Sequence, residues 1–277
     1  MLAASTYLAD SREQQLSREA EYEFFQGIET SNGTKKATEP GRLVEVDALF
    51  FKTLARLNLK PRTVMDIGVS SGVTTVDWLR AFKAHGMKPE MIATDFVMNV
   101  YIHTLGKNIR ALVERNGHLL QIELFGKGIR TYTRFRDYIL GGLVWRKMLC
   151  AYVRSRLPHS ERHGPYKLVS PFLRDQQDIQ LLDDDILLPS PANLIGKADV
   201  VRVANLIQTV YFTDAQMRRA VATVRERCRG KDSLVVICRD YRSHLEGSIF
   251  RLTSQNQFVV EARLGRGSEA EPYFLES

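Results

Sequence analysis

The order of apolar and polar positions predicts an alternation of strands and helices along the chain. Apolar residues at helical spacing predict helices at 44–57, at 73–84 and after Thr213, which forms a capping-box pattern with Gln216. Short apolar runs predict strands at residues 63–67, 91–95, 179–182, 199–203 and 233–238. Strands that alternate with helices are typical of a parallel sheet covered on both faces. We therefore expect a doubly wound, Rossmann-like α/β fold.

The two ends of the chain differ from this pattern. Residues 248–252 and 258–263 predict an antiparallel hairpin that completes a mostly parallel sheet. Residues 1–60 are expected to form an N-terminal helical segment, with one helix at 13–26 before the helix at 44–57. Residues 61–277 are then expected to form one α/β domain. It carries an insertion at about 100–175, because this stretch is too long for one crossover.

The insertion is basic and rich in aromatic residues. Residues 118–124 and 128–133 predict a strand pair, and residues 135–157 predict a helix, continuous or broken, with an aromatic face. The whole chain has a net charge of +7, yet the segment from Lys127 to Lys167 holds ten Lys or Arg residues and two acidic residues. Such a segment is typical of a lid, of a platform for an anionic or aromatic substrate, or of a helix at a membrane surface. An aromatic face packed on the domain, with solvated cations, is the alternative.

A glycine-containing turn joins the first predicted strand to the next helix, with the pattern Asp66-x-Gly68-x-x-x-Gly72. Small residues let the backbone approach a ligand closely, and the helix that follows offers unpaired N–H groups to an anion. The spacing differs from the G-x-G-x-x-G of nicotinamide-binding proteins. A turn that uses glycine only for its backbone geometry remains the alternative.

Acidic residues follow the next two predicted strands. Asp95 ends the second strand and could accept hydrogen bonds from both hydroxyls of a ribose. Asp185 follows the third strand and precedes Ile186, a pair suited to the amino group and the ring face of adenine. Parallel strands end at one edge of their sheet, which is where such sheets bind ligands. Solvated acidic turns are the alternative at each position.

Taken in order, these landmarks and the sequence Asp-Val-Val-Arg-Val-Ala-Asn at residues 199–205 resemble the class I S-adenosylmethionine-dependent methyltransferases. The resemblance runs from about Thr63 to the C-terminus, interrupted by the insertion. It implies S-adenosylmethionine as cofactor, with Asp95 at the ribose and Asp185 and Ile186 at the adenine. The other cofactor contacts that it implies are Asp66, Gly68, Val69, Ser70, Gly72, Phe96, Ala204 and Asn205.

A narrower similarity involves two of these segments. Gly-x-Ser-Ser-Gly at 68–72, together with residues 205–212, is loosely similar to the chemotaxis-receptor methyltransferase branch. Methyl transfer from a sulfonium needs alignment and desolvation more than a protein nucleophile. Asn205, Tyr211 and His103 are candidates to line the acceptor pocket. Of these, Tyr211 and His103 could act as bases, and His103 has the more suitable reference pKa.

Composition restricts the remaining classes of function. The three cysteines and six histidines have no metal-ligand spacing, so we expect no metal site. No signal peptide or membrane-spanning run is present, and we expect a cytoplasmic protein. The acceptor is expected to be a small or lipid-like molecule, anionic or aromatic, whereas no compact motif indicates nucleic acid. A non-catalytic Rossmann-like module that holds a partner through its basic insertion, and a dehydrogenase or other nucleotide-binding enzyme, are the alternative functions. The sequence leaves the oligomeric state open.

Overall fold

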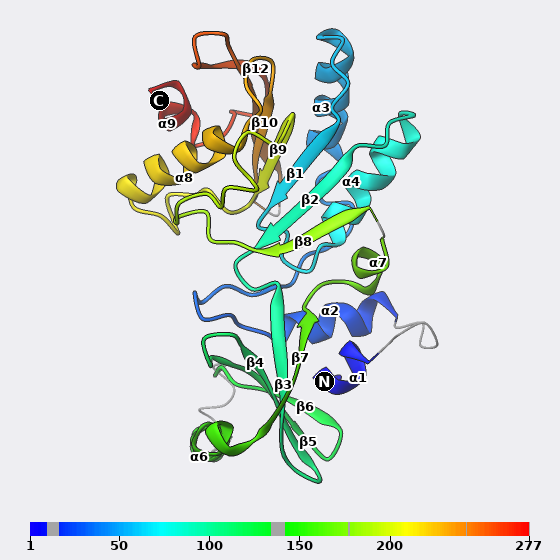
Figure 1. Ribbon diagram of the computed structural model, residues 1–277, viewed down its shortest axis with the longest axis vertical. Coiled ribbons are helices and arrows are strands. Elements are labelled where there is room, and N and C mark those ends of the chain that lie inside the picture. Colours follow the sequence, from blue (N-terminus) through cyan, green and yellow to red (C-terminus); the bar gives the residue numbers. More distant parts are fainter. Residues whose placement is uncertain (10–16, 134–141, 177, 242, 277) are drawn as a thin grey trace. The chain divides into compact units, whose positions relative to one another are not determined.

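The computed structural model describes residues 1–9, 17–133, 142–176, 178–241 and 243–276 (Figure 1). The chain forms two compact units. We call Met1–Thr38 with Val97–Arg174 the insertion unit, and Glu39–Phe96 with Asp175–Ser277 the Rossmann unit. The structure thus divides the predicted N-terminal segment of residues 1–60 between both units.

In the described part of the Rossmann unit, seven strands form one mixed sheet in the order β12-β11-β10-β9-β1-β2-β8. Every neighbouring pair from β8 to β10 is parallel, and the pairs that include β11 are antiparallel. The strands are β1 (Thr63–Ile67), β2 (Glu90–Asp95), β8 (Ile179–Asp183), β9 (Val200–Ala204), β10 (Leu234–Asp240), β11 (Leu245–Leu252) and β12 (Phe258–Leu264). This confirms the expected α/β fold and its C-terminal antiparallel hairpin.

The order of the parallel strands defines a switch point between β1 and β9. From β1 the chain adds β2 and β8 on one side, and it then crosses to add β9 and β10 on the other side. The order matches the 3-2-1-4-5 arrangement of doubly wound sheets, which bind ligands outside the carboxyl ends of the strands at this crevice. We call the edge at which β1, β2, β8, β9 and β10 end the carboxyl edge.

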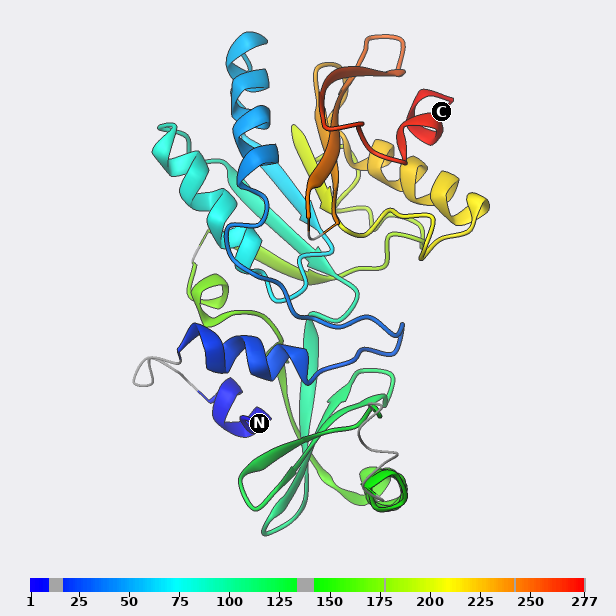
Figure 2. The same ribbon diagram turned by 180° about the vertical axis from the view of Figure 1, so that it is seen from behind.

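Helices cover both faces of the mixed sheet (Figures 1 and 2). Side chains alternate along a strand, so Val64 of β1 packs with α3 and α4 while the next residue, Met65, packs with α8. The predicted capping box of Thr213 and Gln216 begins α8. The helices of this unit are α3 (Val44–Arg56), α4 (Val73–Ala84), α8 (Asp214–Arg227) and α9 (Glu271–Leu275).

The described insertion unit contains an antiparallel sheet in the order β6-β5-β4-β3-β7. Its strands are β3 (Asn99–Gly106), β4 (Ile109–Glu114), β5 (Leu119–Leu124), β6 (Lys127–Arg130) and β7 (Glu161–Lys167). The predicted strand pair is confirmed as β5 and β6, whereas β3, β4 and β7 were not predicted from the sequence. Its helical segments are α1 (Ala4–Leu8), α2 (Arg18–Gln26), α6 (Gly142–Arg156), α7 (Pro171–Arg174) and the short 3₁₀ segment η1 (Leu157–His159).

Two small hydrophobic cores pack against the strands of this sheet. Tyr7 of α1 stacks on Phe24 of α2, and both pack with Leu112 of β4. The neighbouring residue Val113 joins the other core, with Val153 of α6. The predicted helix at 135–157 is therefore observed as α6, and residues 135–141 of that prediction lie outside the described residues. The same holds for residues 13–16 of the predicted helix at 13–26.

Within the ranges that the structure describes, none of the helices combines the length and the apolar character that crossing a membrane requires.

Candidate functional site

The turn between β1 and α4 is held in an unusual backbone conformation at the carboxyl edge. Gly68, Ser70 and Gly72 all have positive φ angles, of 73°, 58° and 80°. The N–H groups of Gly68 and Val69 donate to the Thr94 carbonyl at 2.8 and 3.1 Å, which ties the turn to the end of β2. Protein hydrogen bonds alone thus define the conformation of the turn.

The fold gives a second explanation for the glycine at position 68, which its neighbours along the sequence do not reveal. A Cβ atom at this position would lie 2.9 Å from Cδ2 of Leu206, in the loop that follows β9. Positive φ already disfavours a side chain there. Gly68 is thus favoured by its positive φ angle and by a close approach to the Leu206 side chain, in addition to any role in ligand approach.

Asp95 lies beside this turn, as the sequence predicts for the end of the second strand. Its Oδ2 accepts a hydrogen bond of 2.7 Å from the Ser70 N–H, and its side chain is partly exposed. Phe96, directly after it, is exposed. This hydrogen bond holds the Asp95 carboxylate against the turn that follows β1.

Asp66 is buried between the sheet and the helices α3 and α4. Its two oxygens accept hydrogen bonds from Arg202 of β9, at 3.1 Å from Nε and 2.6 Å from Nη2, and Oδ2 also accepts from Thr75. Arg202 donates further to Asp47 at 3.1 Å and lies over the ring of Trp78. The Asp66 carboxylate is therefore held within the protein, and the ligand contact that the resemblance implies for it stays a prediction.

Burial acts in opposite directions on the pKa of the cation and on the pKa of a carboxylate in this cluster. Burial lowers the pKa of Arg202, but the carboxylates of Asp66 and Asp47 outweigh burial, so the pKa of Arg202 is raised. Burial raises the pKa of Asp47 in spite of the nearby Arg202. Arg202 is thus a fixed cation, and Asp47 is a carboxylate whose ionisation is opposed by its surroundings.

The acidic turn after β8 lies next to Asp95. The Asp184 N–H donates to the Asp95 carbonyl at 2.9 Å, and the Asp184 carboxylate forms a buried two-point pair with Arg227 at 2.7 and 2.9 Å. Oδ1 of Asp185 accepts from the Leu187 N–H at 2.9 Å. Ile186 is buried in the core against α8. Asp95 and Asp185 thus both lie at the carboxyl edge, and the side chain of Ile186 packs in the core next to them.

Asn205 connects the ends of β9 and β10. Its backbone, which has a positive φ of 57°, donates to the Cys238 carbonyl at 2.8 Å, and its Oδ1 accepts from the Asp240 N–H at 2.6 Å. Ala204, the last residue of β9, is partly buried beside it. These bonds leave the amide nitrogen of Asn205 as the remaining hydrogen-bonding group of its side chain.

Four buried polar atoms in the turn after β1, at the end of β2 and in the loop after β9 have no hydrogen-bond partner among the described residues. They are Ser70 Oγ, Ser71 Oγ, Thr94 Oγ1 and Asn205 Nδ2. A buried polar atom left unpaired costs about 1–3 kcal/mol, and proteins normally satisfy it with protein, water or ligand. The four belong to the turn after β1, the end of β2 and the loop after β9, so they surround the switch point.

Arg42 is a residue of this edge that no sequence pattern singled out. It lies just before α3, and its Nε is buried without a hydrogen-bond partner in the described structure. Burial lowers the pKa of Arg42, and Asp240 opposes that shift. The N-cap positions of α3 and α4, Leu43 and Gly72, provide no side-chain cap. A desolvated guanidinium beside uncapped helix ends favours an anionic ligand.

The two candidate bases belong to different units. His103 lies in β3 of the insertion unit, where its Nδ1 is 2.8 Å from the Ser160 Oγ. Partial burial, with Arg162 and His163 nearby, lowers the pKa of His103, which keeps the imidazole neutral at pH 7. Tyr211 is exposed in the loop after β9, in the Rossmann unit.

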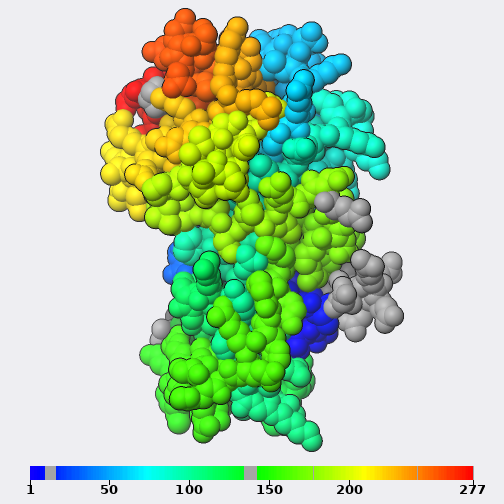
Figure 3. All heavy atoms as spheres, in the orientation of Figure 1, coloured from blue at the N-terminus to red at the C-terminus, as the bar shows by residue number. Residues whose placement is uncertain are grey.

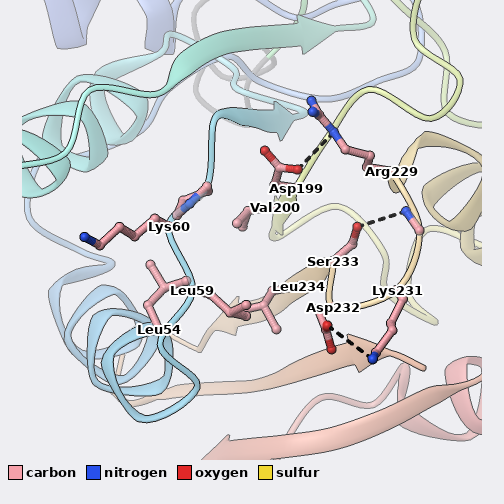
Figure 4. Close-up of a pocket in the computed structure, with 12 residues that line it drawn as sticks. Leu54, Leu59, Lys60, Asp199, Val200, Arg229, Lys231, Asp232, Ser233 and Leu234 are labelled. Atoms are coloured by element: carbon pink, nitrogen blue, oxygen red, sulfur yellow. Dashed lines mark hydrogen bonds and ion pairs between the residues drawn. The ribbon is translucent and has the colours of Figure 1, made fainter. Parts of the chain in front are cut away.

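A cavity of about 230 Å³ lies at the opposite edge of the mixed sheet, where β1, β9 and β10 begin (Figure 4). Among its lining residues, Asp199 pairs with Arg229 at 2.9 Å and accepts hydrogen bonds from the N–H groups of Arg62 and Thr63. These bonds give Asp199 a structural role at the start of the strands. None of the predicted site residues lines this cavity.

The cysteines are free, buried thiols. Burial raises the pKa of Cys228 and Cys238 to about 12, so neither is a nucleophile at neutral pH. In the part of the chain that the structure describes, no three His, Cys, Asp or Glu side chains are grouped so as to hold a metal ion.

Comparison with known proteins gives distant structural matches. No protein-family model and no curated protein sequence matches the chain. The N-methyltransferase NodS from Bradyrhizobium japonicum WM9, in complex with S-adenosyl-L-homocysteine, matches with a TM-score of 0.36 and 13% identity, over 79% of this chain and 72% of that one. The CMeT domain of the citrinin polyketide synthase matches with a TM-score of 0.35 and 12% identity, over 71% of this chain but only 34% of that one. The [4+2]-cyclase SpnF matches with a TM-score of 0.30 and 10% identity, over 70% and 44%.

These matches concern the fold alone, with TM-scores of 0.36 or lower and identities of 13% or lower. These matches do not support the narrower similarity to the chemotaxis-receptor branch. A shared fold does not define a reaction, so the function of this chain has to be argued from its own residues.

Proposed function

We propose that the Rossmann unit binds S-adenosylmethionine at the carboxyl edge and that the protein transfers its methyl group to an acceptor. The observation that carries this proposal is the set of four unpaired, buried polar atoms around the switch point. A ligand with ribose hydroxyls, an amino-acid group and adenine nitrogens could satisfy the three hydroxyls and the amide donor there. The order of Asp66, Gly68, Gly72 and Asp95 along the chain supports the same choice.

Each residue of the edge has a part in this proposal. Asp95, oriented by Ser70, accepts hydrogen bonds from the ribose hydroxyls. Arg42 and the uncapped helix ends hold the carboxylate of the amino-acid group. Asp66 acts from within the core, since its bonds to Arg202 fix the ends of β1 and β9.

The chemistry of transfer requires few protein groups. S-adenosylmethionine supplies an electrophilic methyl group on a sulfonium sulfur. The protein holds the acceptor in line with that group and excludes water. Tyr211 of the Rossmann unit and His103 of the insertion unit stay predictions as candidate bases for the acceptor's proton. Consistent with the basic insertion, we propose a small or lipid-like acceptor that is anionic or aromatic.

Calorimetric titration with S-adenosylmethionine, S-adenosylhomocysteine and NAD tests the choice of ligand. We expect binding of the first two and not of NAD. Asp95→Ala should weaken the binding of both by roughly tenfold or more, because it removes charge-assisted hydrogen bonds. Asp178→Ala is the matched control, since Asp178 is an exposed carboxylate just before β8, at the opposite edge. Equal affinities of the Asp95 and Asp178 variants would contradict the proposed site.

The role of Arg42 can be tested with a truncated ligand. Methylthioadenosine keeps the nucleoside but lacks the carboxylate and ammonium groups. Arg42→Gln should therefore weaken S-adenosylhomocysteine binding roughly tenfold and leave methylthioadenosine binding unchanged. Arg219→Gln, on the exposed face of α8, should change neither. A loss of both ligands on Arg42→Gln would mean that Arg42 supports the fold instead.

Turnover separates catalysis from binding. Release of S-adenosylhomocysteine, with anionic and aromatic acceptors supplied in pools, would support methyl transfer. Tight cofactor binding without turnover in any pool would favour the alternative of a non-catalytic module that holds a partner.

A further inference from the structure

Helix α6 of the insertion unit has apolar residues on two sides. Leu149, Cys150 and Val153 pack against the antiparallel sheet, as the core of this unit requires. A second set of large apolar side chains is exposed: Val144 at 64%, Trp145 at 51%, Met148 at 67% and Tyr152 at 45%. Single exposed apolar residues are common on protein surfaces, but a contiguous group marks an interaction site.

The exposed group forms a stripe along the helix. Val144, Met148 and Tyr152 are four residues apart, so they lie on one line of the helix surface, and Trp145 lies beside them. The stripe spans two turns of α6, the helix that Figure 1 labels and whose residues are coloured green in Figure 3.

Cations border this stripe on both sides. At 100° per residue, Lys147 and Arg154 lie on one flank, and Arg156 lies on the other, with its guanidinium 5.5 Å from the ring centre of Tyr152. All three are exposed. The helix from Gly142 to Arg156 contains four Lys or Arg residues and no acidic residue in its sequence.

We propose that α6 binds the surface of a membrane that contains anionic phospholipids. The helix would lie in the interface, with Val144 and Met148 at the acyl boundary, Trp145 and Tyr152 at the headgroup level and the flanking cations on lipid phosphates. This inference does not depend on methyl transfer. A bilayer is preferred over nucleic acid because aliphatic Val144 and Met148 share the stripe with the two aromatic residues, and an acyl boundary can contact all four. A second copy of α6 is disfavoured by like charge.

Co-sedimentation with lipid vesicles tests the proposal on the full chain. We expect the protein to pellet with vesicles of equal parts phosphatidylcholine and phosphatidylglycerol, to stay in solution with phosphatidylcholine alone, and to bind less as salt rises. The chain has two tryptophans, and Trp78 is buried. A blue shift of emission on binding, absent in Trp145→Phe, would therefore report entry of Trp145 into the interface.

Two paired substitutions separate the apolar and the charged contributions. Val144→Ser with Met148→Ser, and Lys147→Gln with Arg154→Gln, should each lower partition onto the mixed vesicles roughly tenfold or more. The matched controls are Ile195→Ser, an exposed apolar residue of the Rossmann unit, and Lys52→Gln with Lys83→Gln, exposed on α3 and α4. These should bind as the unaltered protein does.

Three results would overturn the inference. The first is an absence of pelleting with the mixed vesicles while circular dichroism shows a folded protein. The second is equal loss of binding in the control variants, which would show attraction by net charge alone. The third is binding of single-stranded RNA that depends on Trp145, without binding to vesicles, which would assign the stripe to nucleic acid.

Discussion

Asp66 and Arg202 are register partners on the neighbouring strands β1 and β9, and their side chains form a two-point ion pair in the core. The pair lies at the switch point, directly beneath the proposed ligand site. Arg202 also binds Asp47 of α3, so three elements depend on one guanidinium. The rigidity of the carboxyl edge rests on this cluster.

Removal of Arg202 should therefore be severely destabilising. Arg202→Met leaves two carboxylates buried without their cation, and we expect a loss of roughly 3–5 kcal/mol in the free energy of unfolding. Urea denaturation followed by circular dichroism measures it. Arg218→Met, which breaks the exposed pair with Glu276, is the control and should cause no measurable change. Similar midpoints for the two variants would show that the buried cluster is not needed for stability.

The unpaired hydroxyl of Thr94 gives a prediction with opposite signs for stability and binding. Thr94→Val replaces that hydroxyl with a methyl group, so the unliganded protein should gain about 1 kcal/mol of stability. Affinity for S-adenosylmethionine should fall if the ligand satisfies Oγ1.

Thr75 provides the comparison for Thr94. Its hydroxyl donates to Asp66 at 2.7 Å, so Thr75→Val should destabilise the unliganded protein. Thermal unfolding with and without ligand measures both effects. A Thr94→Val protein that is less stable than the unaltered chain would show that its hydroxyl is satisfied, for instance by water.

Gly68 can be compared with Gly86, which has a similar φ of +69° but open space within 4 Å of the position that a Cβ atom would take. Gly86→Ala should cost about 1–2 kcal/mol from its backbone alone. Gly68→Ala should cost more, because the new methyl group meets Leu206. Adding Leu206→Ala to Gly68→Ala should recover the difference in urea midpoints. Equal costs at both glycines would mean that the loop moves freely aside.

The buried thiols predict a loss of stability at alkaline pH. Burial raises the pKa of Cys228 and Cys238 to about 12 in the folded state, against about 8.5 in an unfolded chain. Above about pH 8.5 the unfolded state therefore loses protons that the folded state keeps, so stability is complete below that pH and falls as the pH rises towards 12. The slope should be roughly 1.4 kcal/mol per pH unit for each thiol.

Substitution isolates this contribution from those of lysine and tyrosine. The difference in the free energy of unfolding between the unaltered protein and the variant with Cys228→Ala and Cys238→Ala should change with pH above 8.5 and stay constant below it. Chemical denaturation across that range measures it. A constant difference throughout would show that the folded thiols titrate normally.

The sheet that carries the site could be predicted from the sequence because its strands are short, apolar and bounded by turns. The predicted bounds of β1 and β9 agree with the observed ones almost residue by residue. Arg202 within an otherwise apolar strand was a usable signal, since alternation places it on the same buried face as Val200. Its partner could not be predicted, because the register of Asp66 against Arg202 depends on the packing of the whole sheet.

The insertion was harder to predict for physical reasons. In β7 the sequence Glu-Arg-His-Gly-Pro-Tyr-Lys has no apolar alternation and contains Pro165, which sequence rules assign to a turn. The strand exists because β3 pairs with it. Arg42 was missed for a related reason: nothing in its neighbours along the chain distinguishes it, and its surroundings come from residues near 240.

The insertion unit is encoded by two separate stretches of the chain, and its N-terminal stretch supplies α1 and α2 to one face of its sheet. During synthesis that stretch would emerge before its partners Val100 and Leu112, and more than half of the chain would be made before its last partner, Leu168, exists. The chain crosses between units near residues 38, 96 and 174, so neither unit can be obtained by trimming one terminus. A shortened protein that starts near residue 39 would leave an apolar sheet face uncovered, which makes it a candidate for aggregation.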